Sequence, residues 1–476
     1  MSVHTNLFSQ SVKERILTWS MIIPAAVMLI FFVMLFGCIG YTFDEYKVAL
    51  MARTSGYWKG LKQIYYIGNF RYSGYFFNCL VFSFVKNSIY YPFTIMATYL
   101  ALFVVWFKSI HTIVLFVFNK FTGLAVSKTI AAVLSIMFMV QLFFTTSQAS
   151  EIFTCIGVTA NYLTQVVFLM FFASRMLLLK PGYIEYILVV VCGIVIAGCA
   201  ESFSLFVILL SVAFSVLFYV KFNISREHKL RLILFTVVLI IASVITYTAP
   251  GVRFRSEHDT VISNGVVPGN LLSYYVFTLR SLLSNLFPVR FWIGLLTFFP
   301  WLVVGAINSK QVELTNVLFG KLRNIFGVTF LTAILCFCFH IALTLFLFGN
   351  YGYMRIWFAV NFFIAESLCV LFFFIGLKAG VLVYRFFIFS YSLTCLVVSY
   401  FIIHIPKVLN YSHEYQKRIT YLKANNTNFM GQVIVVKPLP ESDILSVSEV
   451  STDPEYDVNA CFSDIHGLIY KVKLGQ

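Results

Sequence analysis

Long apolar stretches determine what this chain can become. Eleven of them run for about 17 to 25 residues, the length that a helix needs to cross the hydrocarbon core of a bilayer. The composition agrees, since 60% of the residues are hydrophobic, only 11% are charged and the mean hydropathy is +0.89, which excludes a soluble domain. We therefore predict an all-α polytopic membrane protein with about 11 transmembrane helices. The predicted helices are 16–40, 88–107, 129–147, 153–174, 184–200, 202–221, 232–248, 289–307, 325–348, 355–377 and 383–404.

The first predicted helix, 16–40, is expected to stay in the membrane as an anchor. It is long enough to cross, and no small-residue cleavage pattern follows it before the charged loop. A different interpretation applies to 109–127, which is apolar but carries His111, Asn119 and Lys120. We expect this stretch to be a cytoplasmic interfacial segment, because one more crossing would reverse the orientation of everything after it.

The ten cysteines form no Cys-x-x-Cys pair, and most of them lie inside the apolar stretches. Buried structural thiols are the usual interpretation of that placement. His258, His340 and His404 lack metal-ligand spacing with one another. We therefore predict neither a disulfide framework nor a metal site.

Orientation follows from Lys and Arg, which favour the cytoplasm when they lie in short loops. If the N-terminus is cytoplasmic, sixteen of the 34 basic residues lie in cytoplasmic connections and seven more lie in the C-terminal tail. The remaining eleven lie on the outer side, mostly in two long outer loops, 41–87 and 249–290. These two loops depart from the expected bias, which indicates a functional reason for their charge.

The character of the chain changes at Pro406. Turn residues and acids there separate short alternating stretches such as 432–436 and 468–472. With eleven crossings, this tail lies outside the cytoplasm. We predict a transmembrane domain over 1–405 and a small extracytoplasmic α/β or β-rich cap over 406–476; the alternative is a solvated, partly ordered tail.

Two adjacent carboxylates, Asp44 and Glu45, follow the first predicted helix at the point where the chain should leave the membrane. An acid in this place avoids most of the cost of burial in lipid and meets water and lipid headgroups together. We interpret one of the two as the catalytic base of an integral membrane enzyme.

The rest of the first outer loop mixes basic and aromatic side chains, among them Trp58 and Lys62. This mixture suits a helix that lies in the membrane interface, where anchoring to anionic lipid is the simpler interpretation. Arg71 lies among turn-forming residues where the chain returns to the bilayer, and its guanidinium could hold two phosphate oxygens.

The second outer loop begins with a helix break at Pro250-Gly251, which presents Arg253 and Arg255 at the surface. Each further polar residue at this membrane face has an ordinary explanation as a snorkelling or ion-paired boundary residue. Their placement on one side favours a site. These residues are Glu151, Asn161, Tyr162, Glu201, Arg280, Arg290 and Arg355.

This pattern resembles the GT-C superfamily of integral membrane glycosyltransferases, in particular the bacterial branch with O-antigen-modifying glucosyltransferases and related uncharacterised families. The residues that carry the resemblance extend over nearly the whole chain. They are Asp44-Glu45, Asn69-Phe70-Arg71, Gly157 to Tyr162 after Glu151, Ala200-Glu201, Ala249-Pro250-Gly251 with Arg255, Arg355, and the tail from Tyr415-Gln416-Lys417-Arg418 to Ile469-Tyr470. Relatives often carry Asp-Asp at the first motif and Asn where this chain has Val252, so the identity of the base between Asp44 and Glu45 stays open.

The resemblance implies a multi-pass protein of the bacterial inner membrane that takes a sugar from a polyprenyl phosphate and transfers it to a glycan or lipid-linked acceptor at the outer face. One carboxylate would deprotonate the acceptor hydroxyl, and Arg71, Arg253, Arg255 and Arg355 would bind the departing lipid phosphate. A single displacement would invert the anomeric centre. Some relatives use a divalent metal, so a metal is an open expectation; membrane lipids are expected partners and nucleic acid is not.

Two other functions remain alternatives. A flippase or transporter of a lipid-linked sugar would place charges near the bilayer midplane and break helices in paired positions. An O-antigen polymerase or ligase would concentrate its arginines in one large late loop and would leave the early acid pair without a role.

Overall fold

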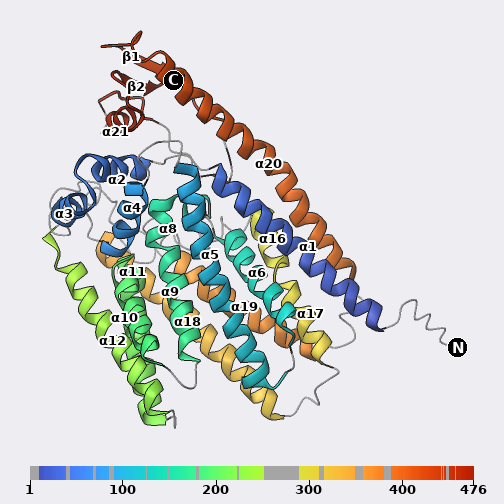
Figure 1. Ribbon diagram of the computed structural model, residues 1–476. Coiled ribbons are helices and arrows are strands. Elements are labelled where there is room, and N and C mark those ends of the chain that lie inside the picture. Colours follow the sequence, from blue (N-terminus) through green and yellow to red (C-terminus); the bar gives the residue numbers. More distant parts are fainter. Residues whose placement is uncertain are drawn as a thin grey trace.

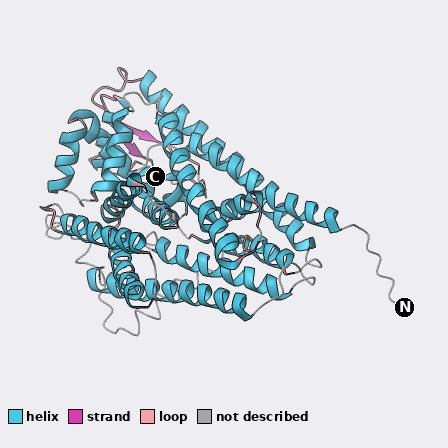
Figure 2. Ribbon diagram, turned by 60° about the horizontal axis from the view of Figure 1, so that its bottom comes forward, coloured by secondary structure: helices cyan, strands magenta, loops and turns pink. Residues whose placement is uncertain are grey.

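The computed structural model shows a bundle of helices with a small C-terminal cap (Figures 1 and 2). It describes residues 10–38, 43–67, 71–84, 91–124, 126–146, 149–177, 182–221, 225–250, 289–309, 316–348, 357–379, 387–440, 442, 444–445, 450–455 and 457–475. The elements of the first half are α1 (Gln10–Gly37), α2 (Phe43–Thr54), α3 (Tyr57–Ile67), α4 (Tyr72–Phe84), α5 (Tyr91–Leu115), the π-helical segment η2 (Phe116–Thr122), α6 (Lys128–Thr145), α7 (Ala149–Thr154), α8 (Ile156–Asn161), α9 (Leu163–Met176), α10 (Tyr183–Ala197), α11 (Glu201–Lys221) and α12 (Arg226–Tyr247). Those of the second half are α16 (Val289–Leu296), α17 (Phe299–Asn308), α18 (Asn316–Phe348), α19 (Phe358–Ala379), α20 (Phe387–Ala424), β1 (Val433–Val436), α21 (Asp457–His466) and β2 (Lys471–Leu474).

The bundle has the composition of a multi-pass membrane protein. Within the described residues, six helical stretches are long and apolar enough to cross a membrane: Phe93–Lys120, Lys128–Thr145, Ile156–Met176, Arg226–Tyr247, Gly320–Ala342 and Phe358–Ala379. Shorter apolar helices cover Ala25–Gly37, Tyr183–Ala197, Glu201–Val216 and Ile293–Asn308. The predicted all-α membrane class is therefore confirmed, while the number of eleven crossings stays a prediction.

Most of the stretch 109–127, predicted to be a cytoplasmic interfacial segment, continues the helix that precedes it. α5 continues to Leu115 and then widens into the π-helical turns of η2, so the same helix extends as far as Thr122. It ends at Gly123, whose φ of 78° is a left-handed conformation that glycine adopts without steric cost. Three polar side chains do not end this helix, which contains no glycine or proline between its first turn and that point.

Two predicted helices are interrupted. The prediction for 153–174 falls on three consecutive helices, α7, α8 and α9, with breaks at Cys155 and Tyr162. The prediction for 289–307 covers α16 and α17, which are separated by a turn at Thr297 and Phe298. Pro300 lies in the first turn of α17, where a proline is tolerated because its missing N–H has no intrahelical partner.

Aromatic side chains fill the contact between α1 and the helices beside it. Phe36 of α1 stacks on Tyr99 of α5 with ring centroids 4.4 Å apart. Phe32 meets Phe103 of α5 and Phe143 of α6, each at 5.2 Å. All five side chains are buried, so the first helix is part of the core of the bundle.

Glycines bring α17 and α19 into backbone contact. A Cβ atom on Gly376 would lie 2.0 Å from the carbonyl oxygen of Leu302, and one on Gly305 would lie 2.2 Å from that of Phe373. Small residues at helix crossings allow this close approach in membrane bundles. The packing of α19 therefore depends on glycine at both positions.

The predicted boundary between the transmembrane domain and the cap, at 405/406, falls inside α20. This helix contains Pro406 and continues to Ala424, a total of 38 residues. At about 1.5 Å per residue it is roughly 57 Å long, well beyond the ~30 Å of a hydrocarbon core. After it, β1 and β2 form a parallel pair in which Val433 lies opposite Lys471, with α21 between them in the chain. Figure 2 shows these strands at the cap end of a structure that is otherwise helical.

Candidate functional site at the junction of bundle and cap

α2 lies between the membrane helices and the cap (Figure 1). It packs against α4 on one side and against α21 on the other. Tyr46 is 2% exposed, and its hydroxyl is 3.0 Å from the hydroxyl of Tyr415 on α20. The Nη1 atom of Arg53 donates a hydrogen bond of 2.9 Å to the carbonyl oxygen of Ile465 in α21. Both ends of the short helix are thus attached to the C-terminal part of the chain.

The predicted base lies in the first turn of this helix. Asp44 and Glu45 follow Phe43, the first residue of α2, and their side chains lie outside the described part of the structure. Acidic residues are favourable in a first turn because the N-terminal end of a helix carries partial positive charge. The backbone of both residues lies at the junction between the bundle and the cap.

Arg71 and Glu201 form an ion pair across 130 residues of sequence. Nε of Arg71 donates to both carboxylate oxygens of Glu201 at 3.1 and 3.0 Å, and Nη2 donates to Oε2 at 2.8 Å. The two side chains are only 21% and 22% exposed. Burial lowers the pKa of Arg71, but the Glu201 carboxylate together with Tyr162 and Tyr75 outweighs this effect and raises the pKa overall, so the guanidinium remains charged. The sequence indicates separate roles for these two residues and does not predict that they pair.

Two more predicted residues lie beside this ion pair. The guanidinium carbon of Arg71 is 5.9 Å from the ring centroid of Tyr162, within the range of a cation–π interaction. Asn161 packs against Gly74, where a Cβ atom would come within 2.1 Å of its Oδ1. Four of the residues that sequence reasoning selected, Arg71, Asn161, Tyr162 and Glu201, therefore meet at one end of the bundle.

Backbone hydrogen bonds hold the segments that carry these residues. Ser73 N–H donates to Gly198 O at 3.0 Å, and Ala200 N–H donates to Asn161 O at 3.2 Å. The side chain of Gln165 donates from Nε2 to Ile196 O and Ala200 O at 2.9 and 2.8 Å. The start of α4, the break before α9 and the turn between α10 and α11 are joined in this way.

Sequence reasoning missed Gln165 and Tyr247. The Tyr247 hydroxyl donates to Glu201 O at 2.8 Å. A buried glutamine inside an apolar helix is the signal that could have drawn attention to Gln165, since its amide needs partners. Tyr247 is one of many tyrosines at the ends of apolar stretches and carries no distinguishing signal in the sequence.

The other predicted residues do not form a described cluster with these. Trp58 is 76% exposed on α3, and Lys62 is exposed on the same helix. Glu151 is half-buried in α7. The residues outside the described part are Arg253, Arg255, Arg280 and Arg355, together with the side chain of Arg290.

A divalent metal would need several carboxylate, imidazole or thiolate ligands close together. Among the described residues there is no group of three or more His, Cys, Asp or Glu side chains that could hold one. The carboxylates of Asp44 and Glu45 are not among these described side chains. The described part of the site therefore supplies one carboxylate, that of Glu201, and it is engaged by Arg71.

Comparison of the chain with protein-family models, with curated protein sequences and with solved structures gives no match.

Proposed function

We propose that the protein is an inverting glycosyltransferase that moves a sugar from a polyprenyl-phosphate-linked donor to a glycan acceptor of the O-antigen or lipopolysaccharide type. The reaction takes place at the outer face of a bacterial inner membrane. Asp44 or Glu45 acts as the base that removes the proton of the acceptor hydroxyl.

The observation that carries the proposal is the position of α2. This helix starts with the acid pair, packs against α4 and is attached to the cap through Tyr46 and Arg53. A lipid-linked donor keeps its tail in the bilayer and its phosphate at the interface. A carboxylate at the boundary between bundle and cap is close to where that phosphate and a water-soluble acceptor would meet.

Arg71 supports the proposal in a different way from the one the sequence indicated. Its Nε and Nη2 atoms are engaged by Glu201, so a phosphate would reach the guanidinium from the side of Nη1. Glu201 orients the group, and the neighbouring Tyr162 ring limits its movement. Positive charge held in this way stabilises a departing lipid phosphate. Convergence of Arg255 and Arg355 on the same phosphate remains a prediction.

A flippase for a lipid-linked sugar is the second candidate, because the structure contains an acidic residue inside a membrane helix, Glu366 of α19. The two functions differ in the fate of the bond between sugar and phosphate. An enzyme breaks it, whereas a flippase moves the donor intact.

The test uses the purified full-length protein in liposomes that contain a polyprenyl-phosphate hexose labelled in the sugar. Acceptor glycan is added on both sides of the membrane, and the lipid phosphate and labelled glycan are quantified separately. We expect equimolar appearance of free polyprenyl phosphate and labelled glycan. Movement of intact donor between leaflets without cleavage would overturn the proposal in favour of the flippase.

A further inference from the structure

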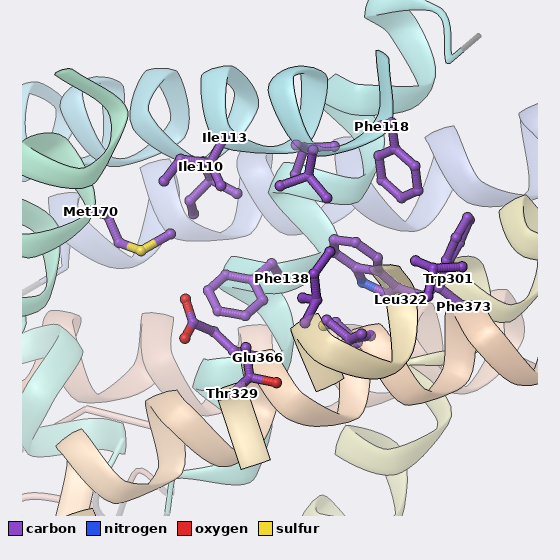
Figure 3. A pocket seen from close by; sticks show the side chains of 15 residues that line it. Ile110, Ile113, Phe118, Phe138, Met170, Trp301, Leu322, Thr329, Glu366 and Phe373 are labelled. Carbon is purple, nitrogen blue, oxygen red and sulfur yellow. The ribbon is translucent and has the colours of Figure 1, made fainter. Parts of the chain in front are cut away.

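A cavity of about 160 Å³ lies among the helices of the bundle (Figure 3). It is bounded by η2 and helices α5, α6, α9, α17, α18 and α19. Met170 of α9 is part of its wall, eight residues after Tyr162. At 1.5 Å per residue the cavity is therefore about 12 Å further along α9 than the Arg71–Glu201 pair. It is a separate feature of the molecule.

The lining is apolar and aromatic with a single acid. Phe118, Phe138, Trp301 and Phe373 contribute rings, and Glu366 contributes the carboxyl group. Figure 3 shows Glu366 beside Thr329 at one part of the cavity, with Trp301 and Phe373 at another. The hydroxyl of Thr329 donates to the carbonyl oxygen of Phe326, 3.1 Å away.

Glu366 has no counter-charge in the described part of the chain. Among the described residues, no Lys, Arg or His forms an ion pair with Glu366. No described side chain or backbone group forms a hydrogen bond with its carboxyl group. Glu366 lies in Phe358–Ala379, one of the helices long and apolar enough to cross the membrane. Unpaired carboxyl groups are costly there and mark sites for a ligand or ion.

We propose that this cavity binds a lipophilic primary amine, with the ammonium group on Glu366 and an apolar body against the aromatic rings. The charge is complementary, and the rings are surfaces to which a cation is also attracted. A cavity of about 150 Å³ accepts a benzene ring, so this one fits a single ring with a short aminoalkyl arm.

Entry of the amine requires one proton transfer. The neutral amine passes through the bilayer, and the Glu366 carboxylic acid gives its proton to the amine nitrogen. The O–H bond breaks, a new N–H bond forms, and a carboxylate and an ammonium remain next to each other. The ion pair created inside the cavity has the close contact that such a pair needs in surroundings of low dielectric constant.

The experiment measures thermal unfolding of the full-length protein in detergent at increasing concentrations of 3-phenylpropylamine or 3-phenylpropanol. These two probes have nearly the same shape and differ in the charge that the amine can carry. Ligand binding to the folded state raises the unfolding temperature by an amount that increases with the logarithm of the ratio of ligand concentration to dissociation constant. We expect the amine to bind the wild-type protein at least tenfold more tightly than the alcohol, and Glu366→Gln to abolish this preference.

Val370→Phe provides a second variant, because Val370 lines the same cavity one helical turn after Glu366. A phenyl group there should fill the space and remove binding of both probes, so the proposal remains testable even if Glu366→Gln fails to fold. Equal binding of amine and alcohol to the wild type would overturn the proposal. So would a preference for the amine that survives in either variant, or the absence of any shift with the amine.

Discussion

At the scale of single residues, the ion pair between Arg71 and Glu201 has a structural role that can be separated from a role in phosphate binding. Glu201→Leu alone leaves a mostly buried guanidinium without its carboxylate, and we expect a loss of about 2 to 3 kcal/mol in the free energy of unfolding. Arg71→Met combined with Glu201→Leu removes both charges and should recover most of this loss. Thermal unfolding of the two single variants and the double variant gives the coupling energy.

Transfer activity of the same variants tests the role of Arg71. We expect the double variant to remain inactive although it is stable, because the donor phosphate has lost its cation. Arg71→Lys should restore little activity, since an ammonium lacks the planar geometry that pairs with two oxygens. If the stable double variant transferred sugar at the wild-type rate, Arg71 would have a structural role alone.

His466 makes the attachment of the cap dependent on pH. Burial, reinforced by the positive charges of Lys423 and Arg53, lowers the pKa of His466 to about 3. In the undocked cap, His466 has the ordinary histidine pKa of about 6.5. Between about pH 6.5 and 3 the undocked cap therefore takes up a proton that the docked cap does not. The free energy that favours the docked cap is therefore fully present above about pH 6.5 and decreases as the pH falls below it. The loss reaches about 2 kcal/mol at pH 5.

Hydrogen exchange of α21 at pH 7.5 and 5.0 measures this effect. His466→Phe is the matched variant, because it keeps an aromatic ring against Tyr46 and Phe462 and cannot be protonated. The protection factor relates each exchange rate to the intrinsic rate at the same pH, which is itself much slower at pH 5.0. We expect the protection of α21 to fall from pH 7.5 to pH 5.0 in the wild-type protein and to change much less in the variant. An equal response in both proteins would assign the pH dependence to other groups.

At the scale of elements, the contact between α17 and α19 gives a clear prediction. Gly376→Ala should lower the free energy of unfolding by about 1 to 3 kcal/mol, because its methyl group would collide with the backbone of Leu302. Gly327→Ala on α18 is the control, since nothing lies within 4 Å of its Cβ position. That change should be neutral or stabilising by up to ~1 kcal/mol, as alanine has the higher helix propensity. Equal destabilisation of both variants in thermal unfolding would show that the close approach is unimportant.

The helices also show how much of the fold could be predicted from the sequence. The length of each apolar stretch predicted the helices well, because a helix that crosses the membrane must be apolar over the thickness of the hydrocarbon core. It did not predict the breaks at Cys155 and Tyr162 or the continuation of α20 through Pro406, which depend on tertiary partners. Tyr415, beyond that proline, is buried against Tyr46 of α2, and such contacts stabilise a helix that contains a proline.

Among the site residues, the sequence indicated which side chains were unusual but not which of them meet. Arg71 and Glu201 were each selected for their place at the end of an apolar stretch, and their pairing depends on how α4 and α11 are packed. Glu366 was overlooked because a single acid in an apolar run does not prevent a transmembrane prediction. Its significance lies in the cavity, which only the packing of several helices creates.

At the scale of the whole molecule, the contacts of α2 with α20 and α21 require that the first loop and the C-terminal cap lie on the same side of the membrane. The distribution of basic residues predicts that this is the outer side. Fusions of alkaline phosphatase, which is active only outside the cytoplasm, at residues 55 and 430 should both be active. An inactive fusion at both sites would reverse the orientation, and activity at only one would contradict the contact itself.

The central claim is that the acid pair at the start of α2 provides the base for sugar transfer. The most direct measurement is the rate of hexose transfer in liposomes by Asp44→Asn, Glu45→Gln and the double variant, with thermal unfolding recorded for each. Loss of the base should lower the rate by roughly 10² to 10⁴-fold. Stability should fall by no more than about 1 kcal/mol per residue, the usual contribution of an acid in a first turn. We expect one single variant and the double variant to show this loss while remaining folded. Wild-type rates in all three would contradict the account.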